Sequence, residues 1–451
     1  MKKLSFLKKS SGPSDSSVDC PVNFAQADSE HSESSLDDFH VVRHGSSFMN
    51  CIVIGHPFLT YNVTVTKEFL DKHNLLLGTY YVLGNDSRYI MEDAFKTYRE
   101  TQNIKTGPGG EALVIARTIQ WLTGQPKSVV FIGTRSMDDD SHRLMTLARS
   151  TGVSLQLQEV KQAITSVHLV LHFNKGRSEI FFSDWWSVPI KLSYMDTNCI
   201  TKILERANLF FACDLTICFM PKALLRLAYY CCARFKQFCV SLSHYGLVCQ
   251  HKQTIMETLA YTDVLFMDLE CAQGLIKLYN IPISCLVCSS FEHQARAISK
   301  WIKSHSKKTC TVIVSDGLYV AYVHTDLHSG KTSKFRSKYL KADKVIDFYG
   351  VNYAFVAGFM AMMIQGCSLE VNIDCAFFTA SLVSTMYGVD FASGEDKTLT
   401  EWKRRMELGE LNVGNKGNKK LLSMPFTVFP SPWKPRTSEG RDESANVEDW
   451  F

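Results

Sequence analysis

The chain reads LFFAC at residues 209–213, FCVSL at 238–242 and DVLFM at 263–267, three short apolar runs in one stretch of sequence. Each run is long enough for a buried strand and too short for a buried helix. Between the first two, residues 222–232 (KALLRLAYYCC) place apolar side chains at helical spacing. Strands that alternate with helices imply right-handed crossovers and a mostly parallel sheet.

The same alternation continues on both sides of this stretch. Further buried strands are expected at 51–55, 128–133 and 311–314, and further helices at 111–122, 141–149 and 291–305. Residues 61–65, 78–83 and 167–182 follow a different, amphipathic pattern, which is typical of antiparallel strands with one exposed face. The sequence therefore predicts a three-layer α/β/α domain with a mostly parallel central sheet, accompanied by a small separate β-sheet.

Composition limits the classes of function. The 451 residues are 45% hydrophobic, and 49 basic residues against 45 acidic ones leave a net charge of only +4. So even a balance argues against nucleic acid or a membrane surface as a partner. The longest apolar run, 353–364, is about half of the ~20 residues that a bilayer span needs. Fifteen cysteines inside apolar stretches and no visible secretory signal indicate reduced thiols, so we expect a cytoplasmic protein that can also be nuclear.

The two ends of the chain differ from its middle. Residues 1–45 are rich in Ser, Asp, Glu and Lys, and residues 395–451 are charged and contain a Pro-rich stretch. Such segments bury too little apolar surface to offset their ordering entropy, so we expect both tails to be largely disordered. The exception is a short helix expected around Trp402 and Leu408. The folded domain is then 46–394.

Four segments carry a resemblance to a known family. In order and spacing they resemble the adenosine kinases of the ribokinase (PfkB) family of carbohydrate and nucleoside kinases, over roughly residues 50–392. The segments are GHPFL at 55–59 with KEFLDK at 67–72, Gly109-Gly110 with Ala116, Gln120-Trp121 and Gly133, DVLF at 263–266, and DFYGVNYAFVAGF at 347–359.

The resemblance implies a ribokinase-like fold and a phosphotransferase ancestry. The small sheet would be the family's lid, built from parts of 58–84 and 165–185. The family's activity is transfer of the ATP γ-phosphate to the 5′-hydroxyl of adenosine to give AMP, with Mg²⁺, in purine salvage. A nucleoside or nucleotide ligand, ATP and Mg²⁺ are therefore implied by resemblance, although the altered residues put their binding in doubt.

The last of the four segments holds the family's chemistry. A glycine-rich turn at a helix N-terminus presents backbone N–H groups that stabilise the transferring phosphate. The Asp after the glycines is the general base for the sugar hydroxyl. Here Gly350 remains, Asn352 replaces the second glycine and Tyr353 replaces the base. A phenol with a reference pKa near ~10 is a poor base at neutral pH, whereas Asn tolerates positive φ, so the turn can survive without its chemistry.

Substrate contacts implied by the resemblance are altered as well. The family's ribose-binding Asp corresponds to Thr60, its neighbouring Asn to His56 and its sugar-contacting Asn to Val114. Gly109-Gly110 either contacts substrate or is only a tight strand-to-helix connection. Arg177 resembles a lid arginine that meets an anion, but an arginine in such a hairpin is more often only a solvated charge.

The remaining acidic positions concern the metal and the base. The family's metal-linked Asn-x-x-Glu pair aligns with Asp268 and Cys271, with Glu270 one position away, so Asp268 and Glu270 are the candidate metal ligands. Asp347 persists, and it is interpreted as a strand-end cap in preference to a substitute base.

These interpretations lead to three alternative hypotheses for the function. The first is a catalytically impaired pseudokinase with a binding or regulatory role, acting alone or with an active paralogue. The second is a working adenosine kinase with a rebuilt site that uses Asp347 or Asp268. The third is an interaction protein in a larger assembly. An enzyme should keep convergent polar groups in the cleft, whereas a structural paralogue should fill it with apolar side chains.

Overall fold

The computed structural model describes most of the central part of the chain. The tails expected at 1–45 and 395–451 lie mostly outside the described residues, and so does Arg177. The described residues are 43–415 except 45–46, 49–50, 77–78, 83–87, 100–102, 125–126, 174–177, 185–187, 284–289, 307, 326–329, 340–343, 387, 390 and 392–396.

A ten-stranded sheet forms the centre of the domain, in the order β17-β16-β15-β14-β13-β12-β11-β3-β7-β8. The seven strands from β14 to β8 are parallel to their neighbours, and β15, β16 and β17 add an antiparallel edge. The six strands expected from the sequence are all in the parallel part. The strands are β3 (Cys51–Ile54), β7 (Val129–Arg135), β8 (Ser154–Glu159), β11 (Leu209–Cys213), β12 (Gln237–Leu242), β13 (Val264–Met267), β14 (Thr311–Ser315), β15 (Val320–Thr325), β16 (Lys331–Ser337) and β17 (Val413–Asn415).

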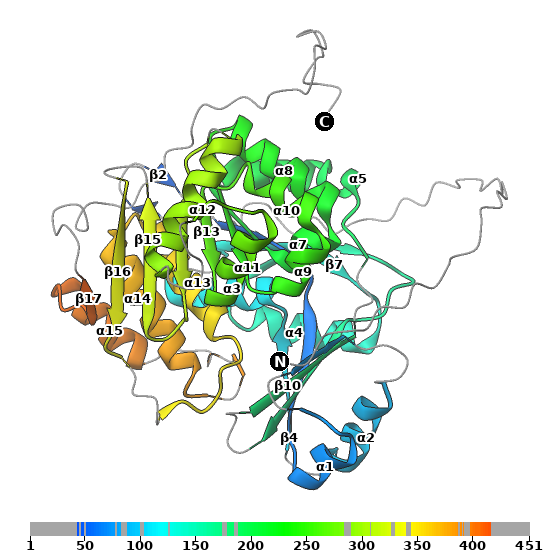
Figure 1. The fold of residues 1–451 in the computed structure, drawn as a ribbon. Helices are drawn as coiled ribbons and strands as arrows, with labels where there is room; N and C mark the ends of the chain where they lie inside the picture. Colours follow the sequence, from blue (N-terminus) through cyan, green and yellow to red (C-terminus); the bar gives the residue numbers. More distant parts are fainter. Residues whose placement is uncertain are drawn as a thin grey trace, which may run out of the picture. The chain divides into compact units, whose positions relative to one another are not determined.

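Helices cover both faces of this sheet (Figure 1). Successive side chains of a strand point to opposite faces, so Cys51 and Val53 join one core while Ile52 and Ile54 join the other. The first core is closed by α3 (Glu111–Thr123), α4 (Asp139–Arg149), α13 (Val351–Ile364) and α14 (Leu369–Val383). The second is closed by α5 (Leu192–Met195), α6 (Asn198–Arg206), α7 (Asp214–Phe219), α8 (Pro221–Ala233), α9 (Tyr245–Gln250), α10 (Lys252–Leu259), α11 (Leu269–Leu278) and α12 (Phe291–Ser306). The expected three-layer α/β/α architecture is confirmed.

The small sheet has five strands in the order β5-β10-β9-β4-β6. It is mixed: β9–β10 and β4–β6 pair antiparallel, as expected, whereas β4–β9 and β10–β5 pair in parallel, which the sequence did not predict. The amphipathic pattern reports one buried face and does not fix strand direction. The elements are β4 (Phe58–Thr64), β5 (Thr79–Val82), β6 (Ile104–Gly109), β9 (Val167–Phe173) and β10 (Ser178–Asp184), with helices α1 (Lys67–Lys72) and α2 (Arg88–Tyr98).

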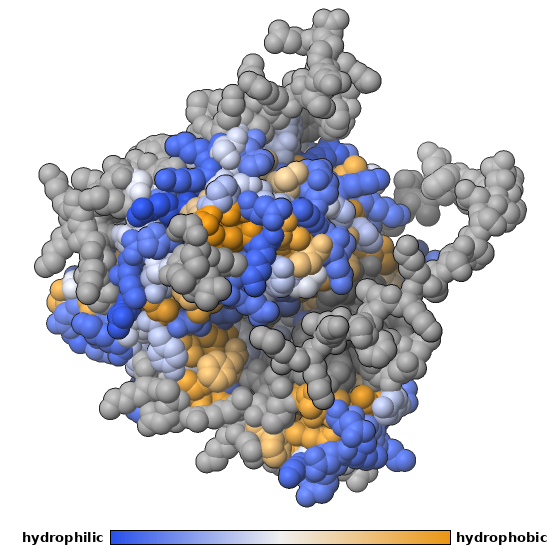
Figure 2. Space-filling view, viewed as in Figure 1, coloured by the Kyte–Doolittle hydropathy of each residue, from blue (hydrophilic) through white to orange (hydrophobic). Residues whose placement is uncertain are grey.

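Helices α1 and α2 cover one face of the small sheet. Phe69 and Leu70 of α1 and Ile90 and Ala94 of α2 pack on apolar side chains of β4 and β9. Figure 2 shows hydrophilic residues on the outer side of these helices and apolar ones toward the sheet. The opposite face of the sheet is therefore the one that contacts the main domain.

The domain continues past residue 394. Helix α15 (Lys397–Glu407) packs on the first core through Trp402, whose indole N–H donates to Asp374 at 2.9 Å. The backbone N–H of Asn412 donates to the same carboxylate, and β17 then pairs with β16. This packing extends the folded domain to Asn415. At the other end, β1 (Arg43–His44) and β2 (Ser47–Phe48) form a two-stranded ladder.

Two expectations from composition concern the whole chain. The cysteines within the described ranges are free, and most of them are buried. Among the described helices, none combines the length and the apolar character that a membrane crossing requires.

Candidate functional site

The double glycine closes the end of β6 against β4. A Cβ on Gly109 would overlap the Thr60 hydroxyl, so a glycine is required there by close backbone approach. Thr60 is 2% exposed, and its hydroxyl has no hydrogen-bond partner among the described residues. Gly110, at φ +87°, precedes α3 as its N-cap. The pair therefore makes the tight strand-to-helix connection that was one of its two sequence interpretations.

The expected sugar-contacting positions are packed. Val114 is 1% exposed and belongs to the core between α3 and α13. The buried hydroxyl of Tyr349 lies 3.4 Å from the position of a Cβ on Gly109. Tyr353 meets the Tyr349 ring edge-on, with centroids 6.2 Å apart. Aromatic side chains thus stand beside the double glycine.

Asp347 organises the turn that precedes α13. Its carboxylate is fully buried and accepts hydrogen bonds from the backbone N–H groups of Tyr349 (2.7 Å) and Gly388 (2.9 Å). Burial raises the pKa of Asp347 to about 6, although these donors favour the charged form. Both oxygens are engaged by backbone, which supports the interpretation as a cap.

The turn itself survives. Gly350 is left-handed at φ +76° and caps α13, and a Cβ there would overlap Val389. The first turn of the helix contains no acidic residue. Asn352 and Tyr353 are both partly buried in that turn, where the resemblance places a glycine and the base.

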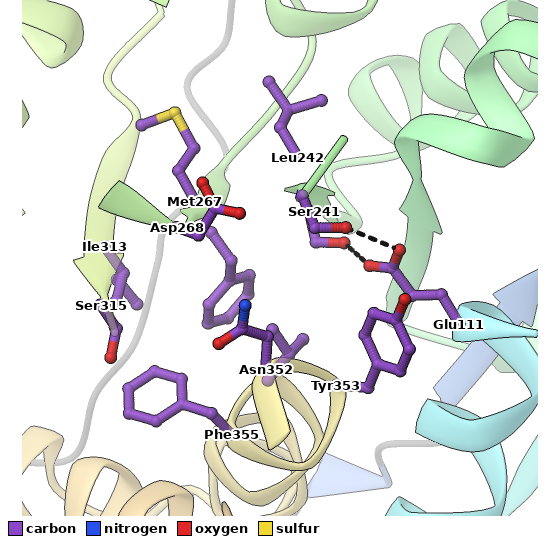
Figure 3. Close-up of a pocket in the computed structure, with 13 residues that line it drawn as sticks. Glu111, Ser241, Leu242, Met267, Asp268, Ile313, Ser315, Asn352, Tyr353 and Phe355 are labelled. Carbon is purple, nitrogen blue, oxygen red and sulfur yellow. Dashed lines mark hydrogen bonds between the residues drawn. The ribbon is translucent and has the colours of Figure 1, made fainter. Parts of the chain in front are cut away.

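A narrow pocket lies between α13 and the carboxyl ends of the central strands (Figure 3). Asn352 projects into it, with its Oδ1 2.6 Å from where a Cβ on Gly317 would lie. The space is about 20 Å³, which is room for about one water molecule. Most of the lining is apolar or aromatic. It consists of Glu111, Ser241, Leu242, Ser243, Phe266, Met267, Asp268, Ile313, Ser315, Asn352, Tyr353, Phe355 and Val356.

The two candidate metal ligands do not converge. Asp268 is the N-cap of α11, and its Oδ1 accepts from the Cys271 N–H at 2.6 Å. Burial raises the pKa of Asp268 above its ordinary value. Glu270 lies in the first turn of the same helix and is exposed. Only Asp268 of the pair lines the pocket.

Histidines join the small sheet to the main domain. His172 of β9 pairs with Asn62 (Nε2 to Oδ1, 3.0 Å), and its Nδ1 lies 4.0 Å from Asp347 Oδ2. Burial lowers the pKa of His172 to about 4, so the ring is neutral beside that carboxylate. His56 lies against Ser166 (Nε2 to Oγ, 2.8 Å), and burial lowers its pKa to about 4. The small sheet is thus docked on the turn that precedes α13.

A buried charged cluster was missed by the sequence reasoning. Glu111 at the start of α3, Asp214 after β11 and His244 after β12 bring one ligand-type atom each within 4.8 Å of one another. Burial and then the Asp214 charge raise the pKa of Glu111. Burial opposes charge on His244, but Asp214 and then Glu111 outweigh it and raise its pKa to about 9. A signal was available, because polar residues that directly follow neighbouring parallel strands meet at one edge of the sheet.

Comparisons with known proteins identify the family. The model of the pfkB family of carbohydrate kinases matches residues 81–395, which is more than half of the chain. The chain belongs to the PfkB family. Adenosine kinase of Dictyostelium discoideum is 22% identical over 351 residues, covering 78% of this chain and 99% of that protein. Adenosine kinase of Saccharomyces cerevisiae is 24% identical over 350 residues, covering 76% of this chain and 96% of that protein.

Solved structures agree on the PfkB fold. Anopheles gambiae adenosine kinase, in complex with P1,P4-di(adenosine-5) tetraphosphate, superposes with a TM-score of 0.68 at 21% identity, covering 77% of this chain and 98% of that one. Schistosoma mansoni adenosine kinase, in complex with 2-fluoroadenosine, superposes with a TM-score of 0.67 at 18% identity, covering 76% of this chain and 97% of that one. The expected ribokinase-like fold and the adenosine-kinase-like character of this PfkB member are confirmed.

Proposed function

We propose that this PfkB-family chain is an adenosine-kinase-like pseudokinase that has lost phosphoryl transfer and acts by binding or regulation. One observation carries the proposal. At the start of α13 the chain presents Asn352 and Tyr353 in place of a glycine and a carboxylate, in a pocket with room for about one water molecule.

The missing carboxylate removes the group that accepts the sugar proton. General-base catalysis contributes on the order of 10²–10⁴ in rate. Tyr353 supplies a phenol, which is mostly protonated at neutral pH. The pocket contains two other carboxylates, but Asp268 caps α11 and Glu111 accepts hydrogen bonds from Ser241 and Ser243. Neither is free to take the role.

The space and the charge of the pocket support the same conclusion. Ligand sites usually enclose about 300–1,000 Å³, whereas this pocket has about 20 Å³ open to a water-sized sphere. Among the described residues, the lining contains two carboxyl groups, of Glu111 and Asp268, and no basic side chain, which disfavours a polyphosphate. With Asp268 committed to a cap and Glu270 exposed, the residues present do not fit a Mg²⁺–ATP complex.

One observation favours a working adenosine kinase as the second candidate. Asp347 has a pKa of about 6, which suits a general base near neutral pH. Against it, the carboxylate is fully buried and both of its oxygens accept backbone hydrogen bonds. In this second candidate Asp347 would have to leave the turn that it holds.

The experiment measures ADP formation by the purified full chain with adenosine, ATP and Mg²⁺. Ordinary kinases turn over at ~1–100 s⁻¹, and we expect this chain to be slower by a factor of about 10³ or more. Calorimetry with adenosine and with ATP tests binding separately from turnover. The variants are Tyr353→Phe, which keeps the ring and removes the hydroxyl, and Asp347→Asn.

The outcomes separate the candidates. Turnover near ~1 s⁻¹ in the wild-type chain refutes the pseudokinase. Turnover abolished by Tyr353→Phe assigns chemistry to the phenol, and turnover abolished by Asp347→Asn assigns it to the substitute base. If the chain binds adenosine or ATP without turnover, it is a ligand-binding pseudokinase. If it shows neither ligand binding nor turnover, its role is to bind a protein partner, such as an active paralogue.

A further inference from the structure

Two acidic side chains and one histidine meet at one edge of the central sheet. His244 Nδ1 lies 3.1 Å from Asp214 Oδ1 and 4.0 Å from Glu111 Oε2. Asp214 is fully buried and Glu111 is 2% exposed, while His244 is partly exposed. Two carboxylates and one imidazole thus point at a common volume.

Neighbouring groups hold both carboxylates in place. The hydroxyls of Ser241 and Ser243 donate to opposite oxygens of Glu111. The backbone N–H groups of Ser243 and His244 donate to Asp214 Oδ2 at 2.8 and 2.7 Å. Hydrogen bonds from such outer partners orient the ligands of metal sites.

The separations match those of a small tetrahedral ion. Bonds of about 2.0–2.1 Å to nitrogen and oxygen place tetrahedral ligand atoms about 3.4 Å apart. The 3.1 and 4.0 Å separations on His244 bracket that value, and the three ligand atoms all lie within 4.8 Å. The narrow pocket is lined by Glu111, Ser241 and Ser243, so one of the three ligands borders a space with room for about one water molecule.

We propose that Glu111, Asp214 and His244 form a binding site for a divalent transition-metal ion, with Zn²⁺ the best fit. Zinc accepts nitrogen and carboxylate oxygen together and commonly takes three protein ligands and one water. Magnesium prefers oxygen in a near-ideal octahedron and fits this set poorly.

Charge supports a divalent ion. Among the described residues, His244 is the only basic side chain that forms an ion pair with Glu111 or Asp214. When both carboxylates are ionised, one imidazolium balances only one of the two charges, whereas a divalent ion bound by a neutral imidazole balances both. The site is independent of the loss of phosphoryl transfer, because no ligand of the ion lies in the turn before α13.

The first experiment titrates Zn²⁺ into the untagged full chain after chelator treatment. We expect one ion per chain with a Kd on the order of 1 µM or tighter, and a raised melting temperature. Mg²⁺ should bind at least about 100-fold more weakly. His244→Gln should weaken Zn²⁺ binding at least about 100-fold, and Ser243→Ala, which removes only an orienting hydroxyl, about 10–100-fold.

The matched control is His73→Gln. His73, at the end of α1, also pairs with a carboxylate, because its Nε2 lies 2.7 Å from Asp93 Oδ2 of α2. The same carboxylate pairs with Lys72. This substitution should leave Zn²⁺ binding unchanged. A weakening equal to that of His244→Gln would overturn the assignment.

A second measurement on the wild-type chain covers the case in which His244→Gln does not fold. Co²⁺ in place of Zn²⁺ reports its own ligands, and we expect a tetrahedral visible spectrum without thiolate charge-transfer absorption. Thiolate absorption would place the ion on cysteines and overturn the proposal. The proposal also fails if the wild-type chain binds no stoichiometric Zn²⁺, or if Mg²⁺ binds as tightly.

Discussion

Asp347→Asn tests whether burial raises the pKa of the carboxyl beside the small sheet or an ion pair with His172 lowers it. Asp347 is fully buried, with two backbone donors and with His172 Nδ1 at 4.0 Å. Burial raises the pKa of Asp347 to about 6 and lowers that of His172 to about 4. Both groups then favour their neutral forms, whereas an ion pair would require the opposite shifts.

The sign and size of the effect follow from these values. A carboxyl whose folded pKa exceeds its unfolded value stabilises the fold below the unfolded pKa, and this stability is lost as pH rises through the folded pKa. The rise from 3.8 to about 6 corresponds to about 3 kcal/mol, of which about 2 kcal/mol is lost between pH 4.5 and 7.5. Asn does not titrate, so the stability of the wild type relative to Asp347→Asn should fall by that amount. The hydrogen bond that Asn cannot make adds about 1–3 kcal/mol at every pH.

The assay is urea unfolding of both chains between pH 4.5 and 7.5. His172 is present in both, so its titration largely cancels in the difference. Asp71→Asn, at an exposed position on α1, is the control for loss of a solvated carboxylate. A difference that does not vary with pH refutes the raised pKa of Asp347. A difference that grows as pH rises establishes an ion pair with His172.

Three further predictions address the turn and the C-terminal helix. Asn352→Gly combined with Tyr353→Asp should leave turnover orders of magnitude below ~1 s⁻¹, because the new carboxylate shares the pocket with Glu111; a coupled ADP assay checks this. Gly350→Ala should destabilise the fold by at least about 1–3 kcal/mol, since the position is left-handed and has no room for a Cβ; an unchanged thermal unfolding midpoint would contradict this. Trp402→Ala should cost about 3–5 kcal/mol in urea unfolding, because the ring is 2% exposed; a loss below about 1 kcal/mol would mean that α15 is loosely attached.

The sequence by itself determined the layers and their order of elements. Short apolar runs predicted strands such as 209–213 and 311–314, and helical spacing predicted 222–232, because both signals lie between close neighbours in the chain. Capping of α11 by Asp268 is equally local, because its side chain accepts from an N–H three residues on, although the sequence indicated Asp268 as a candidate metal ligand and not as a cap.

Tertiary structure alone decided which residues meet Asp268, Asn352 and Tyr353 at the site. Glu111 and His244 are 133 residues apart in the sequence. They meet only because β11 and β12 end at the same edge of the sheet and α3 begins there. The pocket is narrow because Tyr353 and Phe355 of α13 pack toward strands that lie far away in the sequence. The mixed direction of the small sheet and the docking of α15 through Asp374 likewise depend on contacts between distant segments. Sequence pattern fixes which face of an element is buried, and only the assembled fold fixes what that face is buried against.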